Sequence, residues 1–409
     1  MNPFVQKEFI SNWLKHFSSN RQPVYFNFIN PIGFIKTKLS FLYYNIGRNI
    51  TNGLDYTILD KGKDYKRKVI VIFDVISYIK ESGQNLPGYL GLKKIKQYKG
   101  HLSRFTDYES YDDFLAQHYS SSTRRGLRKN EKRLKTNFNI QEKEVYGNIS
   151  KDSYNELLDR VYDLIKVRFQ NLGLDNDILN KKEYYRELLF DMILSKKAVI
   201  HTICHNEIPI AVGISFLSDR VVYYAITTFD VRYRRYNLGH LIITNVAKWC
   251  FENNYDILDY SKGTYEYKLR WSNEDYFFEN HIIYDKTSII CVTTAWILSN
   301  YFKFKQFLRN RNLNETYVKL KFLLDKNKKE SENKNNIRSE DFKDEDVNLN
   351  SLDKVAKDQL SCLEISEKIY DLLYSNPQPL ESVEVFKTKD KSEYFVFAKG
   401  VKKRIIIEE

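Results

Sequence analysis

Hydrophobic residues recur at helical spacing along several segments of the chain. Phe9, Trp13 and Phe17 lie four positions apart, and this spacing puts them on one face of a helix over residues 6–17. The same periodicity predicts a set of further helices. They span residues 111–118, 153–169, 182–194, 238–253, 291–309, 315–324 and 360–373.

Shorter apolar runs, bounded by turn residues, predict strands. Residues 69–73 are a continuous run of Val, Ile and Phe, which is typical of a strand covered on both faces. Three runs at 198–204, 209–217 and 221–227 are joined by short connections rich in Asn, Asp and Ser, as in hairpins. Further strands are predicted at 24–28, 56–59, 138–145, 256–260, 281–284, 382–386, 393–398 and 402–407.

The order of these elements predicts an α/β fold with a mixed sheet flanked by helices. From residue 138 to residue 260 the order is β-α-α-β-β-β-α-β. Residues 326–358 are rich in Lys, Glu, Asn, Ser and Asp, so we expect a flexible charged linker. The chain then divides into an N-terminal half at 1–110, a domain at 111–325, this linker, and a small α+β appendage at 359–409.

Composition and charge narrow the class of protein. Hydrophobic residues make up 42% and charged residues 29%, so the chain can bury a sizeable core, and wholesale disorder is excluded. The net charge of +12 favours anionic partners, such as nucleotide phosphates, nucleic acid or a membrane surface. The 4 cysteines show no CxxC spacing, which argues against a zinc site and fits a reducing compartment. With no signal peptide and no apolar run of about 20 residues, we expect a soluble cytoplasmic protein without metal.

An arginine-rich loop precedes the helix that begins near Leu238. A helix N-terminus offers unpaired backbone N–H groups, which suit a pyrophosphate. Gly239 would let a ligand approach the backbone closely, and Asn237 tolerates a left-handed conformation. We therefore expect these amides to face a cleft and bind a diphosphate, with Arg234 and Arg235 adding charge. An ordinary turn with solvated arginines is the alternative.

Two motifs here resemble those of a known family. Arg234-x-x-Asn237-x-Gly239 resembles the Arg/Gln-x-x-Gly-x-Gly/Ala loop with which GNAT acyltransferases bind the pyrophosphate of acyl-CoA. Asn237 stands where that family has its first glycine. Residues 256–271 resemble the strand–Gly–x–x–x–Tyr–Lys–x–x–Trp signature of the cellulose-biosynthesis (CelD-type) branch, which is related to the FemAB peptidyltransferases. The basic segment 122–129 and residues 2–14 are also similar to that branch. The resemblance covers about 1–290 and implies two GNAT-like halves, with the N-terminal one degenerate.

The resemblance implies an N-acyltransferase that moves an acyl group from acyl-CoA directly to an amine. The acceptor would be an amino sugar or another cell-envelope precursor. Asp259 and Glu266 could accept a proton from the attacking ammonium, Tyr267 could protonate the leaving thiolate, and Lys268 could hold an anionic group. The acyl-CoA site would comprise Arg234, Arg235, Asn237, Leu238, Gly239 and His240. The acceptor site would comprise Arg125, Arg128, Arg270 and Trp271.

Each of these residues also has a structural interpretation. Asp259 could cap the following loop, Lys268 could form an ion pair, and Tyr267 and Trp271 could pack in the core. Two other functions stay open: a Fem-like aminoacyl transferase that uses aminoacyl-tRNA, and a GNAT-like binding protein without activity. The basic helix over 124–135 fits a phosphorylated acceptor, tRNA phosphates or a solvated face. Nucleic acid is expected as a partner only under the first of these alternatives, and peripheral contact with a membrane stays open.

Overall fold

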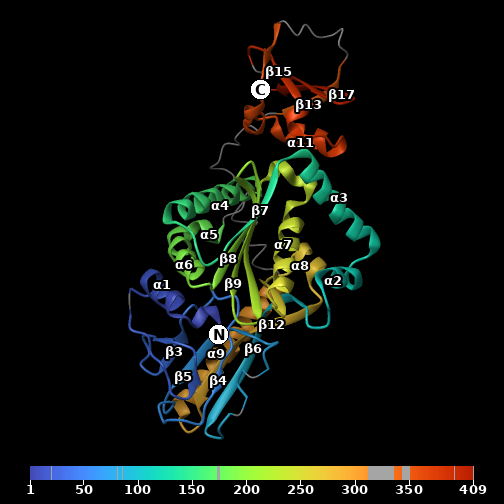
Figure 1. Ribbon diagram of the computed structural model, residues 1–409. Coiled ribbons are helices and arrows are strands. Elements are labelled where there is room, and N and C mark those ends of the chain that lie inside the picture. Colours follow the sequence, from blue (N-terminus) through green and yellow to red (C-terminus); the bar gives the residue numbers. More distant parts are fainter. Residues whose placement is uncertain are drawn as a thin grey trace.

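The computed structural model describes residues 1–19, 21–80, 82–84, 86–172, 176–311, 336–342, 351–390 and 392–408. Most of them surround one large mixed sheet with the strand order β2-β3-β5-β12-β6-β11-β10-β9-β8-β7 (Figure 1). Its strands are β2 (Phe34–Lys36), β3 (Leu42–Asn45), β5 (Val69–Ile76), β6 (Leu90–Arg104), β7 (Ile140–Val145), β8 (Ala198–His205), β9 (Ile208–Leu217), β10 (Val221–Phe229), β11 (Ile257–Lys262) and β12 (Glu274–Asp285). The predicted fold class, a mixed α/β sheet flanked by helices, is confirmed.

The N-terminal half builds one end of this sheet. It contains η1 (Pro3–Val5), α1 (Lys7–Phe17) and a separate two-stranded pair, β1 (Ile29–Asn30) with β4 (Thr57–Ile58). All eight residues of β5 are buried, as its continuous apolar run predicts. Its Ile70 and Ile72 belong to the core that includes α1, whereas Val69 and Val71 pack with α9 (Ile289–Asn310).

One strand prediction in this half is wrong, and one central strand was not predicted. Residues 24–28 form no strand, and only Val24 makes an isolated bridge, to Phe34. The apolar pattern there comes from burial, because Phe26 and Phe28 pack among aromatic rings. The Phe28 carbonyl accepts from the Leu59 N–H at 2.9 Å, but among the described residues no strand ladder forms over 24–28. Conversely, β6 was not predicted, although it is central and pairs with β12 and β11. Its four lysines hide the pattern, and pairing on both sides outweighs their low strand propensity.

The central domain follows the predicted order of elements. After α2 (Tyr111–His118) and α3 (Ser121–Asn137) come β7, α4 (Lys151–Leu172), α5 (Asp177–Asn180), α6 (Lys182–Leu194), the β8–β9–β10 meander, η2 (Val231–Tyr236), α7 (Leu238–Glu252), β11 and α8 (Glu266–Trp271). Helices α4 and α6 cover one face of the sheet, and α7 covers the other (Figure 1). Strand β11 joins this domain to the N-terminal half by pairing with β6.

The C-terminal unit is a second, five-stranded sheet with the order β13-β17-β16-β15-β14. It consists of β13 (Asn336–Asp341), β14 (Asp353–Lys354), η6 (Lys357–Cys362), α11 (Ser366–Ser375), η7 (Leu380–Ser382), β15 (Glu384–Lys387), β16 (Glu393–Ala398) and β17 (Val401–Glu408). Strands β13 and β14 lie inside residues 326–358, which were expected to be a flexible linker. Both pair with strands of this unit, so the residues of these two strands belong to the sheet and not to a linker. The helix predicted at 315–324 lies outside the described residues.

Candidate active site

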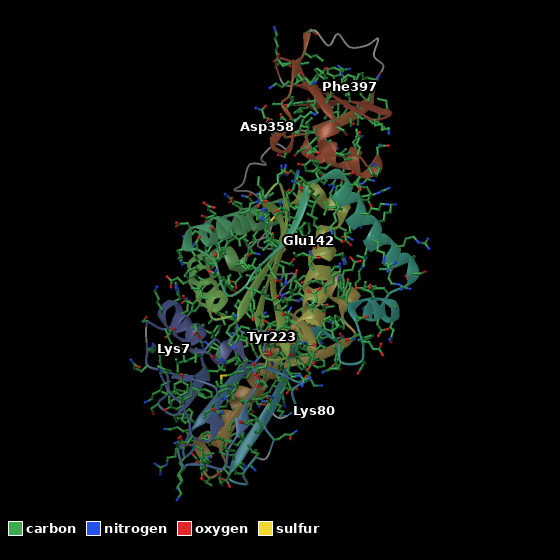
Figure 2. The ribbon with its side chains drawn as sticks, viewed as in Figure 1. Lys7, Lys80, Glu142, Tyr223, Asp358 and Phe397 are labelled. Atoms are coloured by element: carbon green, nitrogen blue, oxygen red, sulfur yellow. The ribbon has the colours of Figure 1, made fainter. Side chains whose placement is uncertain are left out.

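Strands β10 and β11 run parallel but separate after a short paired section. They pair at three positions, the last of which joins Tyr223 to Asp259. Beyond it, β10 stays bonded to β9 as far as Phe229, and β11 pairs with β6 at Lys262. A register shift in β10 between Tyr224 and Ile226 accompanies the separation. The second half of β10 thus has a sheet partner on one side only among the described strands. Tyr223 marks this point at the middle of the molecule (Figure 2).

Hydroxyl groups line this unpaired part of β10. The buried hydroxyls of Tyr224 and Thr227 interact with each other, and among the described residues they have no other hydrogen-bond partner. The Thr228 hydroxyl, on a side chain that is 1% exposed, also lacks a partner in the same part of the chain. Because an unsatisfied buried hydroxyl costs free energy, a polar ligand bound along this edge of β10 could supply the missing hydrogen bonds.

Helix α7 begins beside the end of β10. Asn237 precedes it in the left-handed region with φ 60°, as its tolerance for that conformation predicts. The Asn237 carbonyl accepts from His240 and Leu241, which leaves the N–H groups of Leu238 and Gly239 at the tip of the helix. A Cβ at Gly239 would lie 3.1 Å from Cε1 of Phe229, the last residue of β10. The close contact explains why a glycine suits this position.

Arg168 of α4 reaches the same region and is a candidate site residue that was not predicted from the sequence. Its Nη1 donates to the Thr227 carbonyl at 3.2 Å, and its guanidinium lies 4.5 Å from the centre of the Phe229 ring. Burial lowers the pKa of Arg168, and nearby Tyr267 and Tyr224 oppose that shift. The guanidinium keeps its charge because an arginine pKa stays far above neutrality. Arg168 lies in an amphipathic helix where a basic residue is ordinary, so the sequence does not indicate that its side chain reaches the end of β10.

The loop arginines contact the C-terminal unit. Nη2 of Arg234 lies 3.0 Å from Oε1 of Glu367 on α11, and Nη1 of Arg235 donates to the Asp371 carbonyl at 3.0 Å. Arg235 also lies over the Tyr374 ring, 4.6 Å from its centre. The two side chains that were expected to add charge at a diphosphate are therefore held by α11 in this structure.

An aromatic cluster attaches the C-terminal unit to this loop. Tyr370 of α11 is fully buried, with its ring centre 4.5 Å from that of Tyr233 and 4.9 Å from that of Phe138. The Tyr236 hydroxyl donates to the Tyr370 carbonyl at 3.1 Å, and Asn137 donates to the Leu373 carbonyl at 2.9 Å. These contacts form one continuous core between the two units, next to the start of α7.

Asp259 is fully buried at the point where β10 and β11 separate. Its carboxylate accepts from the Tyr276 hydroxyl at 2.6 Å, the Ser261 N–H at 2.7 Å and the Tyr78 hydroxyl at 3.0 Å. Burial raises the pKa of Asp259 to about 6, although the hydrogen bonds from Tyr276 and Ser261 oppose the shift. An amine cannot touch this carboxylate directly, but the half-buried Tyr78 connects it to the surroundings.

Lys268 is the second buried charge of the region. Its side chain is 4% exposed, and Nζ donates to the Lys262 carbonyl at 2.6 Å and the Ser261 carbonyl at 3.3 Å. Burial lowers the pKa of Lys268 to about 8, and the attraction of Asp259 opposes the shift. Lys268 thus bonds the backbone at the end of β11, and in place of the expected structural ion pair its partners are two carbonyl groups.

The other motif residues of α8 divide into buried and exposed groups. Trp271 is fully buried, and its indole N–H donates to Nδ1 of His240 at 2.9 Å, which links α8 to the first turn of α7. Burial lowers the pKa of His240 and raises that of Tyr267. Glu266 and Arg270 are exposed and form an ion pair with each other. Trp271 and His240 therefore hold the two helices together.

The N-terminal half completes the site. Asn52 donates to the Ser261 hydroxyl at 2.9 Å, and Oδ1 of Asp74 lies 2.6 Å from Nζ of Lys262. With Tyr78, these residues surround the end of β11 from the neighbouring half. No local sequence pattern indicates these residues, because their contacts join positions more than 180 residues apart.

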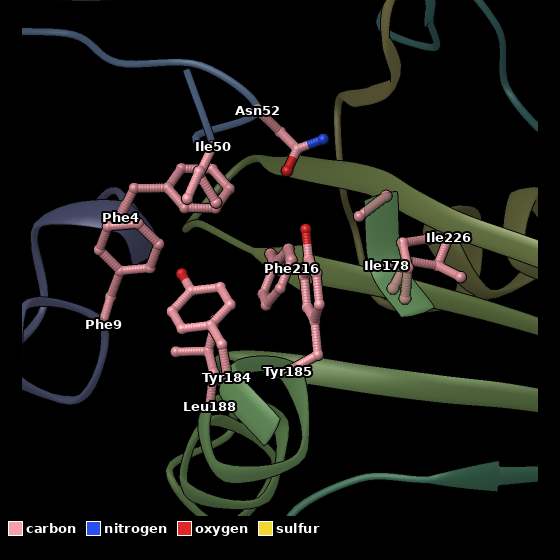
Figure 3. Close-up of a pocket in the computed structure, with 11 residues that line it drawn as sticks. Phe4, Phe9, Ile50, Asn52, Ile178, Tyr184, Tyr185, Leu188, Phe216 and Ile226 are labelled. Carbon is pink, nitrogen blue, oxygen red and sulfur yellow. The ribbon is translucent and has the colours of Figure 1, made fainter. Parts of the chain in front are cut away.

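A cavity of about 100 Å³ adjoins this interface. Asn52 and Ile226 lie on its walls, together with Tyr184 and Tyr185 from α6 (Figure 3). The Tyr184 hydroxyl is buried and has no hydrogen-bond partner among the described residues. Asn52 links the cavity wall to β11, because it also donates to the Ser261 hydroxyl.

The basic helix α3 presents Arg125 and Arg128 to solvent, away from the buried residues above. The structure therefore brings together the start of α7, α8 and Asp259, but not these two arginines. Within the described ranges, no three His, Cys, Asp or Glu side chains are grouped so as to hold a metal ion. None of the described helices is long and apolar enough to span a bilayer.

Comparison with known proteins identifies the central domain. Residues 121–269 match the family model described as acetyltransferase (GNAT) domain. No curated protein matches the chain. The match identifies a GNAT acetyltransferase domain in this part of the chain and supports an acyltransferase.

Several solved structures are distantly similar to this chain. They include a conserved protein of unknown function from Bacteroides thetaiotaomicron (11% identity, TM-score 0.45, 69% of this chain and 90% of that chain covered). They also include FemX (11%, 0.46, 69% and 92%) and L-PGS from Bacillus licheniformis (11%, 0.41, 66% and 85%). At these values the likenesses say nothing about substrate.

Proposed function

We propose that this protein is an acyl-CoA-dependent N-acyltransferase that transfers the acyl group directly to an amine. The observation that carries the proposal is the unpaired half of β10, with its unsatisfied hydroxyls, next to the start of α7. A pantetheine amide can bond to a strand edge and to such hydroxyls. We propose an amino sugar or another cell-envelope precursor as the acceptor, as the CelD-type resemblance implies.

The diphosphate of acyl-CoA would bind at the tip of α7. The N–H groups of Leu238 and Gly239 would donate to phosphate oxygens, and the helix dipole favours negative charge there. Arg168 would add a positive charge from the opposite side of β10. Arg234 and Arg235 would contribute mainly at longer range while they stay bound to α11.

The acid and base groups would come from the residues around β11. The amine nitrogen forms a bond to the thioester carbon, the C–S bond breaks, and the ammonium proton must leave. Tyr78 would accept that proton as it passes its own to Asp259, whose pKa of about 6 leaves it ionised at neutral pH. Tyr267 would protonate the thiolate, and its pKa, raised by burial, keeps its proton available. Glu266 would act only as an exposed charge at the rim.

Calorimetry with acetyl-CoA and longer acyl-CoAs tests the proposal. Gly239→Val should weaken binding at least tenfold, because the new side chain meets Phe229 and covers the helix tip. Gly126→Val is the matched control, since a Cβ at this other helical glycine meets no atom within 4 Å. Arg168→Gln should weaken binding by a similar factor. If the unaltered protein shows neither binding heat nor protection from thermal unfolding, acyl-CoA is not the donor. Binding without turnover of any amine would favour an inactive binding protein.

The exposed basic face of α3 favours a second candidate, a Fem-like aminoacyl transferase. Arg125, Arg128, Lys129 and Lys132 all face solvent on this helix and could contact tRNA phosphates. A gel shift with aminoacyl-tRNA at near-physiological ionic strength, lost in Arg125→Glu with Arg128→Glu, would support it. Binding that disappears at this ionic strength would reject it.

A further inference from the structure

Helix α9 has two apolar faces, and the fold uses only one of them. Its inner face packs on the sheet of the N-terminal half through four buried residues at intervals of three or four. They are Cys291, Ala295, Ser299 and Phe302. This face provides the ordinary hydrophobic stripe of a helix that covers a sheet.

The outer face of α9 is hydrophobic and exposed. Ile289 is 84% exposed, Trp296 61% and Phe304 61%. Ile290, Ile297, Tyr301 and Phe307 are also largely exposed on this helix. Seven exposed apolar side chains along one helix, three of them Phe or Tyr and one Trp, are more than the scattered apolar residues of an ordinary surface, and such a face marks an interaction site. Trp and Tyr are typical of the interface between lipid and water.

The charge around this patch selects the partner. Residues 286–311 contain Lys286, Lys303, Lys305, Arg309 and Arg311, but no Asp or Glu. Long basic side chains can lie along an apolar surface while their charges reach headgroup phosphates. A second copy of this chain would instead bring two basic helices together, with repulsion between them. An anionic lipid surface satisfies both the apolar and the charged groups.

The dimensions also fit a helix that lies in the plane of a membrane. With 22 residues α9 is about 33 Å long, yet its inner face stays packed on the sheet. It packs on the sheet of the N-terminal half, at the opposite end of the molecule from the C-terminal unit (Figure 1). We propose that the outer face of α9 docks the protein onto a membrane containing anionic lipid, with its aromatic side chains at the level of the headgroups.

The chain carries its own reporter for this contact. Trp13, Trp249 and Trp271 are buried, so Trp296 is the exposed one of the 4 tryptophans. Adding vesicles of phosphatidylcholine with phosphatidylglycerol to the full chain should shift its fluorescence to shorter wavelength and protect it from iodide. The protein should also sediment with these vesicles, and at least tenfold less with pure phosphatidylcholine. High salt should weaken the binding.

Paired variants separate docking from general effects on folding. Ile297→Glu with Phe304→Glu should lower the vesicle partition coefficient at least tenfold while keeping Trp296 as reporter. Lys303→Glu with Lys305→Glu should lower it on anionic vesicles. The matched control is Leu194→Glu with Ile208→Glu, which places the same charges at exposed apolar positions elsewhere and should change nothing.

Several results would overturn the proposal. One is Trp296 fluorescence that does not change when anionic vesicles are added at low salt. Another is a vesicle partition coefficient that falls as much in the control variant as in Ile297→Glu with Phe304→Glu. A third is protection of Trp296 from iodide when the protein concentration is raised without vesicles. The last would identify a second copy as the occupant. Because no acyl-CoA is present, failure here leaves the acyl transfer proposal standing, and failure of acyl-CoA binding leaves the docking result standing.

Discussion

Replacing Asp259 by Asn tests how a fully buried carboxylate affects both stability and catalysis. The carboxylate has no exposed surface and three hydrogen-bond donors. Asn keeps the shape, and Tyr78 can accept from its amide in place of donating. The substitution therefore removes the charge while disturbing the packing as little as possible.

The sign and size of the effect follow from the raised pKa. Burial raises the pKa of Asp259 from 3.8 to about 6, so the folded protein binds this proton more tightly than the unfolded chain. The ionised carboxyl thus costs stability, and the cost grows as pH rises from 3.8 to 6 and then stays constant. A shift of this size corresponds to about 3 kcal/mol. Asp259 also stabilises the charged form of Lys268, and Asp259→Asn loses this attraction. We therefore expect the substitution to raise the free energy of unfolding at neutral pH by only about 2 kcal/mol.

Urea unfolding at pH 4 and pH 7.5, followed by tryptophan fluorescence, measures this effect. The free energy of unfolding of Asp259→Asn relative to the unaltered protein should rise by about 2 kcal/mol between the two pH values. Asp163→Asn, on the exposed side of α4, is the control and should show no such rise. Turnover should fall by about a hundredfold or more with acyl-CoA binding unchanged. A relative stability that is independent of pH would refute the account of the buried charge, and full activity would remove Asp259 from the mechanism.

Three further predictions concern the residues around this site. Because the Lys268 pKa is lowered in the folded state, the unfolding free energy of the unaltered protein should rise by about 3 kcal/mol between pH 8 and 10.5. Lys268→Met should lose this rise. An identical pH profile of the two proteins in urea unfolding would contradict this prediction. Tyr370→Ala should open the aromatic contact with Phe138 and Tyr233, at a cost of about 3 kcal/mol, and speed limited proteolysis of the C-terminal unit; unchanged cleavage would show that the contact is not decisive. Trp271→Phe should cost about 1–3 kcal/mol in unfolding free energy, because His240 loses its hydrogen bond, whereas Trp296→Phe on the exposed face of α9 should cost little; equal effects would count against the α7–α8 link.

Local patterns in the sequence predicted most elements of the central domain. Its helices bury one stripe each, and its strands alternate with short turns, so hydrophobic periodicity is sufficient evidence there. Predicted helix 182–194 coincides with α6, for example. Strand β6 escaped prediction because its lysines are compensated by long-range pairing and by contacts such as that of Lys96, whose Nζ lies 4.5 Å from the centre of the Phe277 ring.

The candidate site could be predicted in part. The short motif around Asn237 and Gly239 indicated the start of α7, since a left-handed residue before a helix has a local signature. Tyr78, Asn52 and Arg168 had none, because they reach the site from other elements. The contact of Arg234 with Glu367 depends on how a separate unit docks, which no spacing along the chain reveals.

The sequence by itself determined the fold class, the basic balance of charge and the motif that indicates acyl transfer, because these depend on residues close together in the chain. Only the tertiary structure decided that Asp259 is buried under two tyrosines, that α11 holds the loop arginines, and that the outer face of α9 is exposed. The apolar pattern of α9 is the same whether its second face is covered or free. Burial is a property of the neighbours that long-range contacts bring to a residue, so it appears only when the chain is folded.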